Sequence, residues 1–326
     1  MAARLQPPVA PPVEVVDLRR LSARDLEPLL AEETQFWGSD LEWDFEKSAD
    51  LVRRFVELRA LNGSALVEDG LVTGYVYYVL EENKGLIGDL YVRHEFQGAG
   101  REKQLLEAAL DPVMATPHVS RVECQLMMLR GDPRRVAPRP QYLRTFERNF
   151  MTIDLRHAAL REGKPRRPIY IEKWSDRYQD GAAHLIAAAY TGHIDGLIND
   201  QYRGSVGARR FLYNIVQYPG CGAFYRPASF AAFEAVSGHL CGISLASLVA
   251  PECGHITQIC VAPNVKGTGV GHELLRQSLT ALREAGCRSA SLTVTAANSE
   301  AVSLYERVGF ETVRRFSAFV WEGFQR

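Results

Sequence analysis

Apolar positions along this chain recur with two spacings, one typical of strands and one typical of helices. Residues 169–174, Ile-Tyr-Ile-Glu-Lys-Trp, alternate as a half-buried strand does. Helical spacing from about 269 to 285 predicts a helix that ends at Gly286. The same two rules predict the rest of the second half: helices at 180–190, 206–217 and 298–307, and strands near 223–235, 239–249, 255–261, 289–295 and 312–320. This order predicts an α/β fold of the mixed α+β type, a mixed sheet flanked by helices.

An internal repeat indicates two domains of similar build. Residues 90–102 and 259–271 both predict a strand end, a glycine turn and a helix start. Gly98 and Gly100 match Gly267 and Gly269 at one offset of 169 positions, and the leucines of the following helices continue the match. We therefore predict domains at 14–160 and 168–326. The linker between them is Arg156–Pro168, which is basic and contains one Gly and two Pro.

Composition narrows the classes of protein to which this chain could belong. Among 326 residues, 38 Lys and Arg balance 39 Asp and Glu, and 46% are hydrophobic. This balance argues against a broad basic face for nucleic acid, and no apolar run is long enough for a membrane span. The six cysteines include no CxxC pair, which argues against a structural metal and favours reduced thiols in the cytoplasm. Composition does not indicate an oligomeric state.

The glycine turn Lys266-Gly-Thr-Gly-Val-Gly271 is a candidate phosphate site. Glycines allow a ligand to approach the main chain, and a helix start offers N–H groups and a positive dipole end. A pyrophosphate fits such a place. An ordinary tight turn is the alternative. The turn lacks the Gly-Lys-Ser/Thr of a nucleotide-binding P-loop, and its strand follows a hairpin, unlike a dinucleotide-binding unit.

A second candidate motif spans residues 298–310. Asn298 is a suitable helix N-cap, Ala301 and Tyr305 share one helical face, and Gly309 is a helix stop before Phe310. By itself, Tyr305 would be interpreted as a core aromatic residue.

Together the two motifs resemble the GNAT (Gcn5-related N-acetyltransferase) superfamily. Its pattern is Val-x-Pro, then Arg/Gln-x-x-Gly-x-Gly/Ala, then Asn-x-x-Ala-x-x-x-Tyr before Gly-Phe. Here Val261-Ala-Pro263, the turn and residues 298–310 fit, with Lys266 in place of Arg or Gln. Two such domains resemble the tandem members of the superfamily. Each is then expected to contain a mixed, partly splayed sheet flanked by helices.

The resemblance implies acetyl-CoA as cosubstrate, with its pyrophosphate on the N–H groups of 267–272. It also implies that the strand ending at Val261 splays from its neighbour, so that pantetheine pairs with free backbone groups there. A backbone N–H near Val261 would polarise the thioester carbonyl. The cofactor residues expected on this basis are Ile259, Cys260, Val261, Lys266, Gly267, Thr268, Gly269, Val270, Gly271, His272, Asn298, Ala301 and Tyr305.

Direct transfer to an amine needs a base for the amine and an acid for the leaving thiolate. Strand alternation places His255, Thr257, Ile259 and Val261 on one face, with Gln258 on the other. His255 stands where several family members have a Glu, so it is the candidate base, and an exposed histidine without function is the alternative. The resemblance makes Tyr305 the candidate acid.

A polar stretch after the first helix of the second half is the candidate acceptor site. His193, Asp195, Asn199 and Tyr202, together with Asp200, could hold a cationic amine, and a solvated loop is the alternative. Cys221 and Cys260 have no His or Asp nearby in sequence, which disfavours a ping-pong mechanism through a thiol.

The leading hypothesis is an acetyl-CoA-dependent N-acetyltransferase acting on a small-molecule or peptide amine, with its chemistry in the second half. A non-catalytic acyl-CoA sensor or interaction protein is the alternative, and transfer of a longer acyl chain or transfer to a protein lysine is the third. The first half is predicted to lack chemistry. Its Glu102 replaces Gly271 and would repel a pyrophosphate, and Leu86 replaces His255.

Overall fold

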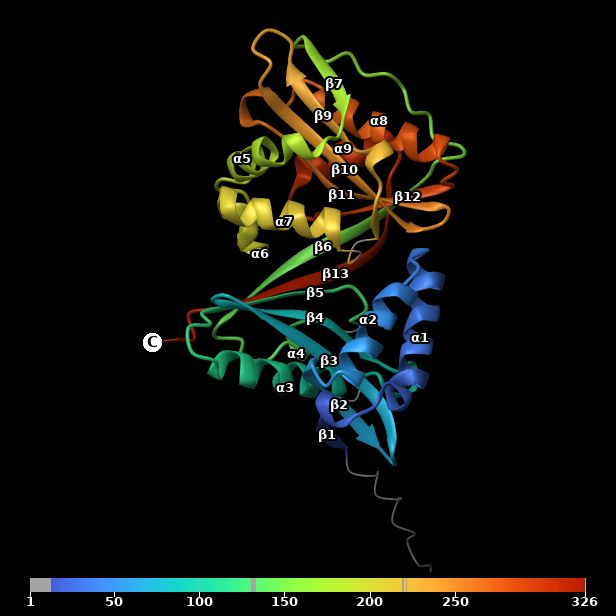
Figure 1. The fold of residues 1–326 in the computed structure, drawn as a ribbon, viewed down its shortest axis with the longest axis vertical. Coiled ribbons are helices and arrows are strands. Elements are labelled where there is room, and N and C mark those ends of the chain that lie inside the picture. The colour runs from blue at the N-terminus through green and yellow to red at the C-terminus, as the bar shows by residue number, and fades with distance from the viewer. Residues whose placement is uncertain (1–12, 99, 130–132, 219, 221, 326) are drawn as a thin grey trace, which may run out of the picture. The chain divides into compact units, whose positions relative to one another are not determined.

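The chain forms two compact units, and the computed structural model describes residues 13–98, 100–129, 133–218, 220 and 222–325. Of these residues, the first unit comprises those from 13–35, 49–144 and 319–325, and the second those from 36–48 and 145–318. In each unit helices cover both faces of a sheet (Figure 1). Within the described residues, no helix is long and apolar enough to cross a bilayer.

The first unit is built on strands in the order β1-β2-β3-β4-β5. All neighbours are antiparallel except β4 and β5, which run parallel. Its strands are β1 (Glu14–Asp17), β2 (Asn62–Glu68), β3 (Leu71–Glu81), β4 (Lys84–Val92) and β5 (Arg121–Leu126), and its helices are α1 (Ala23–Leu41), α2 (Glu46–Glu57), α3 (Arg101–Ala115) and α4 (Pro133–Val136). The end of α1 and the start of α2 belong to the second unit. The one-turn α4 lies in the proline-rich stretch 130–140, whose first residues fall outside the described ones.

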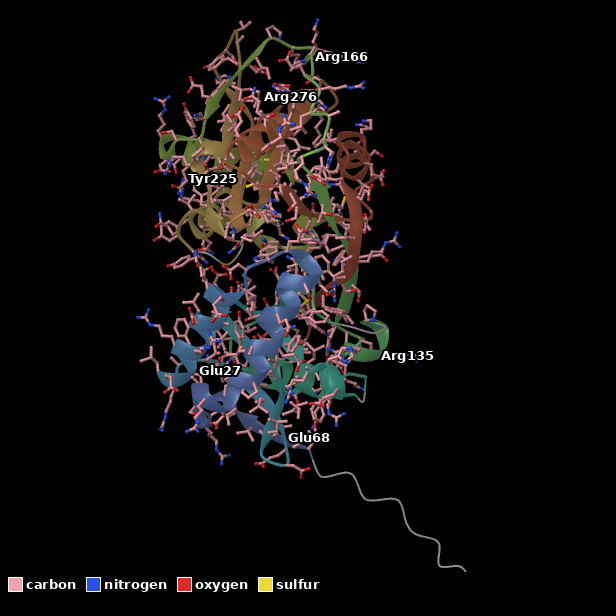
Figure 2. The ribbon with its side chains drawn as sticks, turned by 90° about the vertical axis from the view of Figure 1, so that its right-hand side faces the viewer. Glu27, Glu68, Arg135, Arg166, Tyr225 and Arg276 are labelled. Carbon is pink, nitrogen blue, oxygen red and sulfur yellow. The ribbon has the colours of Figure 1, made fainter. Side chains whose placement is uncertain are left out.

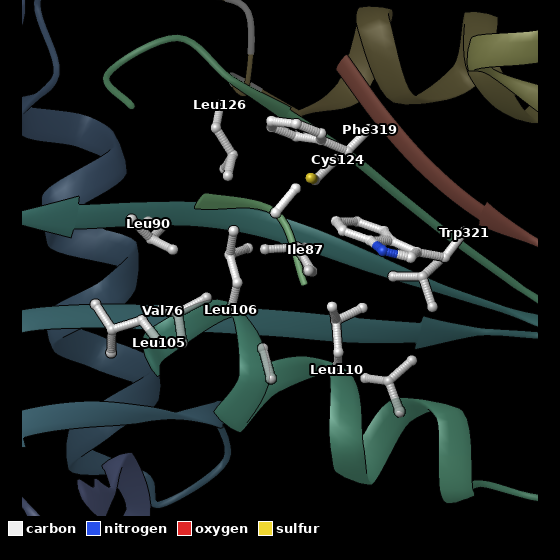
Figure 3. Packing of buried hydrophobic residues seen from close by; sticks show 14 of the residues in the cluster. Val76, Ile87, Leu90, Leu105, Leu106, Leu110, Cys124, Leu126, Phe319 and Trp321 are labelled. Atoms are coloured by element: carbon white, nitrogen blue, oxygen red, sulfur yellow. The ribbon is translucent and has the colours of Figure 1, made fainter. Parts of the chain in front are cut away.

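The core of the first unit lies between α3 and the sheet (Figure 3). Leu105, Leu106 and Leu110 of α3 are fully buried against the strands. The end of the chain completes this core, because Phe319 and Trp321 pack into it and the Trp321 indole N–H donates to the Pro138 carbonyl at 2.8 Å. The C-terminal strand therefore stabilises the unit that contains the N-terminal helix.

The second unit is built on strands in the order β6-β12-β11-β10-β9-β7, with β8 paired to β10. β13 lies beside β6. Among the strand pairs of this unit whose register is described, β11 and β12 run parallel and the others run antiparallel. The strands are β6 (Leu143–Asp154), β7 (Ile169–Lys173), β8 (Ala223–Phe224), β9 (Phe230–Glu234), β10 (Leu240–Ala250), β11 (Cys253–Val261), β12 (Ser289–Thr295) and β13 (Glu311–Glu322), and the helices are α5 (Gln179–Ala189), α6 (Asp195–Ile198), α7 (Ser205–Gln217), α8 (Val270–Glu284) and α9 (Ser299–Val308). Residues 145–154 of β6 and residues up to 318 of β13 belong to this unit.

The two faces of this sheet carry different helices. Helices α5 and α7 pack on one face around Ile186, Leu212 and Ile243. Helices α8 and α9 pack on the other around Leu275 and Phe310 (Figure 1). These elements confirm the mixed sheet flanked by helices that the sequence predicts. The predicted strand 223–235 is interrupted, because Arg226–Ala228 forms a short 3-10 turn that contains Pro227.

β11 and β12 part halfway along their length. Their parallel pairing runs from Cys253 opposite Ser289 to Ile256 opposite Leu292, although β11 continues to Val261. The partly splayed sheet expected from the family resemblance is therefore present. β4 and β5 show the same feature, since their pairing ends at Ile87 opposite Cys124.

A bulge at Thr257 changes the alternation of side chains in β11. On β10, Leu245 pairs with Gln258 and the next residue, Ala246, pairs with Ile256, so no residue of β10 stands opposite Thr257 in the register. Beyond the bulge, Ile259 joins the core beside α8, as Ile256 does. The prediction of strict alternation along this strand was therefore wrong. Because of the extra residue, His255 and Ile259 point to opposite faces of the sheet, and His255 and Gln258 do not.

Two acidic side chains are buried together in the first unit. The Tyr75 hydroxyl donates to Glu33 at 2.9 Å and lies 3.4 Å from Asp89, and both carboxyl groups are buried. Burial raises the pKa of Asp89 to about 6. The folded chain therefore binds a proton that the unfolded chain releases near its ordinary pKa, and this contribution to stability is lost as pH rises from about 4 to 6.

We predict that Asp89→Asn stabilises the first unit at pH 7.5 by about 1–3 kcal/mol, because it removes a buried charge and keeps a hydrogen-bonding amide. Hydrogen exchange of peptides from β3 and β4 measures the local free energy of opening. The gain should shrink toward pH 4. Asp111→Asn, at an exposed site on α3, should give no gain at either pH. A loss of protection in Asp89→Asn at pH 7.5 would contradict the assignment.

Candidate active site

A cleft of about 820 Å³ lies in the second unit where the free edge of β11 meets the start of α8 and one side of α9. Eleven of the predicted cofactor residues line it. They are Ile259, Cys260, Val261, Lys266, Gly267, Gly269, Gly271, His272, Asn298, Ala301 and Tyr305. Two do not: the Thr268 hydroxyl donates to the Val265 carbonyl at 2.6 Å, and Val270 is fully buried in the core.

The glycine turn has the backbone conformation that the sequence predicts. Gly267 and Gly269 have φ of +72° and +92°, values that favour glycine. Gly269 is the N-cap of α8, so the first N–H groups of the helix have no intrahelical acceptor. These donors and the positive end of the helix dipole form a place for an anion beside the cleft.

Helix α9 presents Tyr305 to the same cleft. Asn298 caps the helix by accepting from the Ala301 N–H at 3.3 Å, and Gly309 ends it with φ of +110°. Burial raises the pKa of Tyr305 well above its usual value, and the Asp195 carboxylate raises it further against the opposing effect of Arg148. The phenol therefore carries its proton throughout the neutral range and can donate a hydrogen bond to a developing thiolate.

The predicted acceptor residues occupy different environments. His193 lines the cleft beside Tyr190, and their rings meet edge to face at 5.3 Å. Tyr202 stacks on Tyr190 at 4.5 Å instead of facing the cleft. Asn199 caps a short turn by accepting from the Gln201 N–H at 3.0 Å. The Gln258 amide donates to the Tyr190 hydroxyl at 3.0 Å and so ties β11 to the end of α5.

Asp195 is buried and holds this loop to the sheet. Its carboxylate accepts from the Thr295 hydroxyl and lies 3.3 Å from Arg148 of β6, while its backbone N–H donates to His193 Nδ1 at 3.2 Å. Arg148 also donates to Thr293 and Thr295 at 3.2 and 3.1 Å. The pair therefore positions His193 at the cleft.

His255 lies outside the lining of the cleft. Its side chain is buried against Trp43, with ring centroids 5.0 Å apart, and its Nδ1 is 2.9 Å from the Ser291 hydroxyl. Burial lowers the pKa of His255 to about 4, so the ring is neutral at physiological pH. The bulge at Thr257 explains why this histidine does not share the face of Ile259.

The cysteine in the cleft is poorly suited to nucleophilic attack. Burial raises the pKa of Cys260 to about 12, which keeps the thiol protonated at neutral pH. Cys221 falls outside the described residues. Among those residues there is no cluster of three or more His, Cys, Asp or Glu side chains able to hold a metal ion.

Several residues of the site escape sequence reasoning. Tyr190 and Arg307 line the cleft, and Arg148 and Gln258 support it. Arg307 follows Leu304 by three positions, so extending the helical face of Ala301 and Leu304 would have included it. Arg148 carries no local signal, because its partner Asp195 is distant in sequence.

This sheet, with its parted strands, glycine turn and tyrosine-bearing helix, is the fold of a Gcn5-related N-acetyltransferase. A protein of that class from Sphaerobacter thermophilus superposes with a TM-score of 0.67 at 19% identity, covering 95% of each chain. A tandem GNAT protein from the clavulanic acid biosynthesis pathway gives 0.58 at 19% identity, covering 95% of this chain and 98% of its own. These likenesses show the fold, including its tandem form.

The family model of the Acetyltransferase (GNAT) family matches residues 151–310, which therefore belong to that family. A mycothiol acetyltransferase from Corynebacterium jeikeium is 37% identical over 60 residues, 18% of this chain and 17% of the relative. An N-alpha-acetyltransferase MAK3 from Arabidopsis thaliana is 30% identical over 70 residues, 22% of this chain and 37% of the relative. The matched segments thus span well under two thirds of both relatives.

We predict that Gly269→Val lowers the affinity for CoA by at least about tenfold. A side chain disfavours the φ of +92°, so the turn is expected to change its backbone conformation and to shift its N–H groups. Isothermal titration calorimetry with CoA measures the effect. Gly286→Val is the matched control, because Gly286 has φ of +94° in open space at the other end of α8. Equal affinities in the two variants would exclude the turn as a CoA contact.

Proposed function

We propose that the second unit transfers an acetyl group from acetyl-CoA to an amine by direct attack. The observation that supports this most is one cleft bordered by the unpaired edge of β11, the glycine turn and Tyr305. An extended pantetheine chain can pair with the strand edge, and the turn can hold the pyrophosphate. The thioester would then lie near the end of β11.

The reaction would form one C–N bond and break one C–S bond. A neutral amine attacks the thioester carbonyl, and a backbone N–H near Val261 stabilises the oxyanion. The amine loses a proton to a base or to water, and Tyr305 donates its proton to the leaving CoA thiolate. His193 and Tyr190 line the acceptor side, which favours a small-molecule or peptide amine as the acceptor.

We further propose that the first unit lacks this chemistry. The Gly98 N–H in its glycine turn donates to the Glu102 carboxylate at 3.3 Å. Arg101 does not reach toward a ligand, because Glu68 holds its guanidinium at 2.7 and 2.6 Å.

We also propose a reducing, cytoplasmic setting, which the five described cysteines support because they are free thiols.

The test is a thiol-release assay on the full chain with acetyl-CoA. The acceptors are spermidine, kanamycin, amino acids and a short peptide with a free N-terminus, and calorimetry counts the acetyl-CoA sites. Acetylated amine equal to released thiol, with one tight site per chain, would support the proposal. Tight binding without release for every acceptor would favour a non-catalytic acyl-CoA sensor. Octanoyl-CoA and a lysine-containing protein, run in parallel, test a longer acyl chain and transfer to protein lysine.

We predict that Tyr305→Phe lowers kcat by a factor of about 10 to 10⁴ and leaves the affinity for acetyl-CoA nearly unchanged, as loss of a general acid should. The ring, which packs on Phe310 with centroids 6.0 Å apart, remains in place. Single-turnover kinetics and calorimetry separate the two effects. An unchanged kcat would leave Tyr305 with a packing role only.

The hypothesis from the sequence that His255 is the base makes a prediction about pH, which can be tested against the buried position of its ring outside the cleft lining. A base is active when unprotonated, so the rate should fall as pH drops through about 4, where burial places the His255 pKa. His255→Asn should remove this limb of the profile. A variant that unfolds more easily but keeps the limb would show that His255 only packs against Trp43.

A further inference from the structure

A second pocket, of about 830 Å³, lies beside the cleft in the second unit, and we call it the linker pocket. One wall is formed by residues 157–161 of the linker, and the other by α8 and the end of α9. His272 and Arg307 line both the linker pocket and the cleft. A ligand that follows the cleft past the glycine turn therefore meets the linker pocket next.

The linker is held against the glycine turn and α8 by backbone hydrogen bonds. The Arg166 N–H donates to the Thr268 carbonyl at 2.8 Å, and the Gly163 N–H donates to Glu273 at 3.3 Å. A Cβ at Gly163 would lie 2.7 Å from His272 Nδ1, so glycine permits this approach. Figure 2 labels Arg166 on the linker and Arg276 on α8. These contacts make the linker a fixed wall of the pocket.

The charges of the linker pocket favour an anion. Arg276 is neutralised by Glu273 at 2.9 and 2.6 Å, and Asp154 is paired with Arg156 and lies 3.2 Å from His157. Among the described residues, the exposed Arg161 and Arg307 have no ion-pair partner, and Glu311 is a further carboxylate that lines the pocket. Two guanidinium groups from separate elements therefore face the pocket with their charge uncompensated by a partner.

We propose that Arg161 and Arg307 bind the 3′-phosphate of CoA. This inference rests on the proposed function, in which the backbone of the glycine turn holds the pyrophosphate. CoA carries one further phosphate, a monoester on the adenosine ribose that is close to dianionic at neutral pH. Guanidinium groups match phosphate oxygens in paired hydrogen bonds. The linker thus contributes directly to the choice of acyl donor.

Calorimetry of the full chain with CoA and with 3′-dephospho-CoA, in a low-salt buffer without phosphate, tests the proposal. The wild-type protein should bind CoA about tenfold or more tightly than dephospho-CoA, the effect of one or two charged hydrogen bonds. Arg161→Ala and Arg307→Ala should each weaken CoA binding about five- to tenfold and change dephospho-CoA binding less than twofold. The double variant should bind the two ligands equally.

The control variant is Arg209→Ala, which removes an exposed arginine of α7 that pairs with Asp180 at 2.8 Å and should change neither affinity. The preference for CoA should also decline as salt rises, since both arginines are exposed and salt screens exposed charges. Equal binding of CoA and dephospho-CoA by the wild-type protein would overturn the proposal, as would an equal loss for both ligands in the variants. Either result leaves thiol release intact, whereas failure of the proposed function would abolish it.

Discussion

The parting of β11 from β12 after Ile256 is the constraint on which the site depends. Backbone N–H and C=O groups in a sheet must be paired with something, and here one edge of β11 is left to a ligand or to water. The bulge at Thr257 begins at the same point and changes which face of the sheet the following side chains of β11 point to. The glycine turn then carries the chain directly from this edge into the start of α8. Because the pairing of β11 with β12 stops early, one cleft is bordered by the edge of β11, the start of α8 and Tyr305.

The side of the cleft where we propose that the acceptor binds depends on a strand from the first half of the sequence. β6 pairs with β12 over seven positions, from Ser289 opposite Asp154 to Thr295 opposite Arg148. The guanidinium of Arg148 meets Asp195, whose backbone holds His193 at the cleft. Breaking such a pair leaves an uncompensated buried charge, so the loop is strongly tied to β6. A chain cut within the linker would leave the second unit without this strand.

Features governed by near neighbours in sequence could be predicted, and those governed by distant partners could not. The glycine turn, the Asn298 cap and the Gly309 stop follow from local backbone chemistry, and the structure shows all three. The face to which His255 points depends on a bulge in the pairing of β11 with β10, and the alternation of side chains along a single strand cannot predict such a bulge. The burial of Asp195 depends on Arg148, and the stacking of Tyr202 depends on Tyr190. Likewise, the sequence predicted the linker as a connection between domains, whereas its contacts with the glycine turn and α8 make it one side of the linker pocket.

The two units share the strand and turn arrangement around the glycine turn and differ in one side chain at the start of the following helix. In both, a parallel pair of strands parts early and a glycine turn follows, with Gly88 at the bulge in one and Thr257 in the other. In the first unit, the Glu102 carboxylate already accepts from the Gly98 N–H. A tethered carboxylate has a high effective concentration, so an outside anion would have to displace it and meet its repulsion. The second unit has Gly271 at that position, which adds no charge and lines the cleft. On our proposal, this one side chain at a helix start is why the first unit does not bind an anion at its glycine turn and the second unit does.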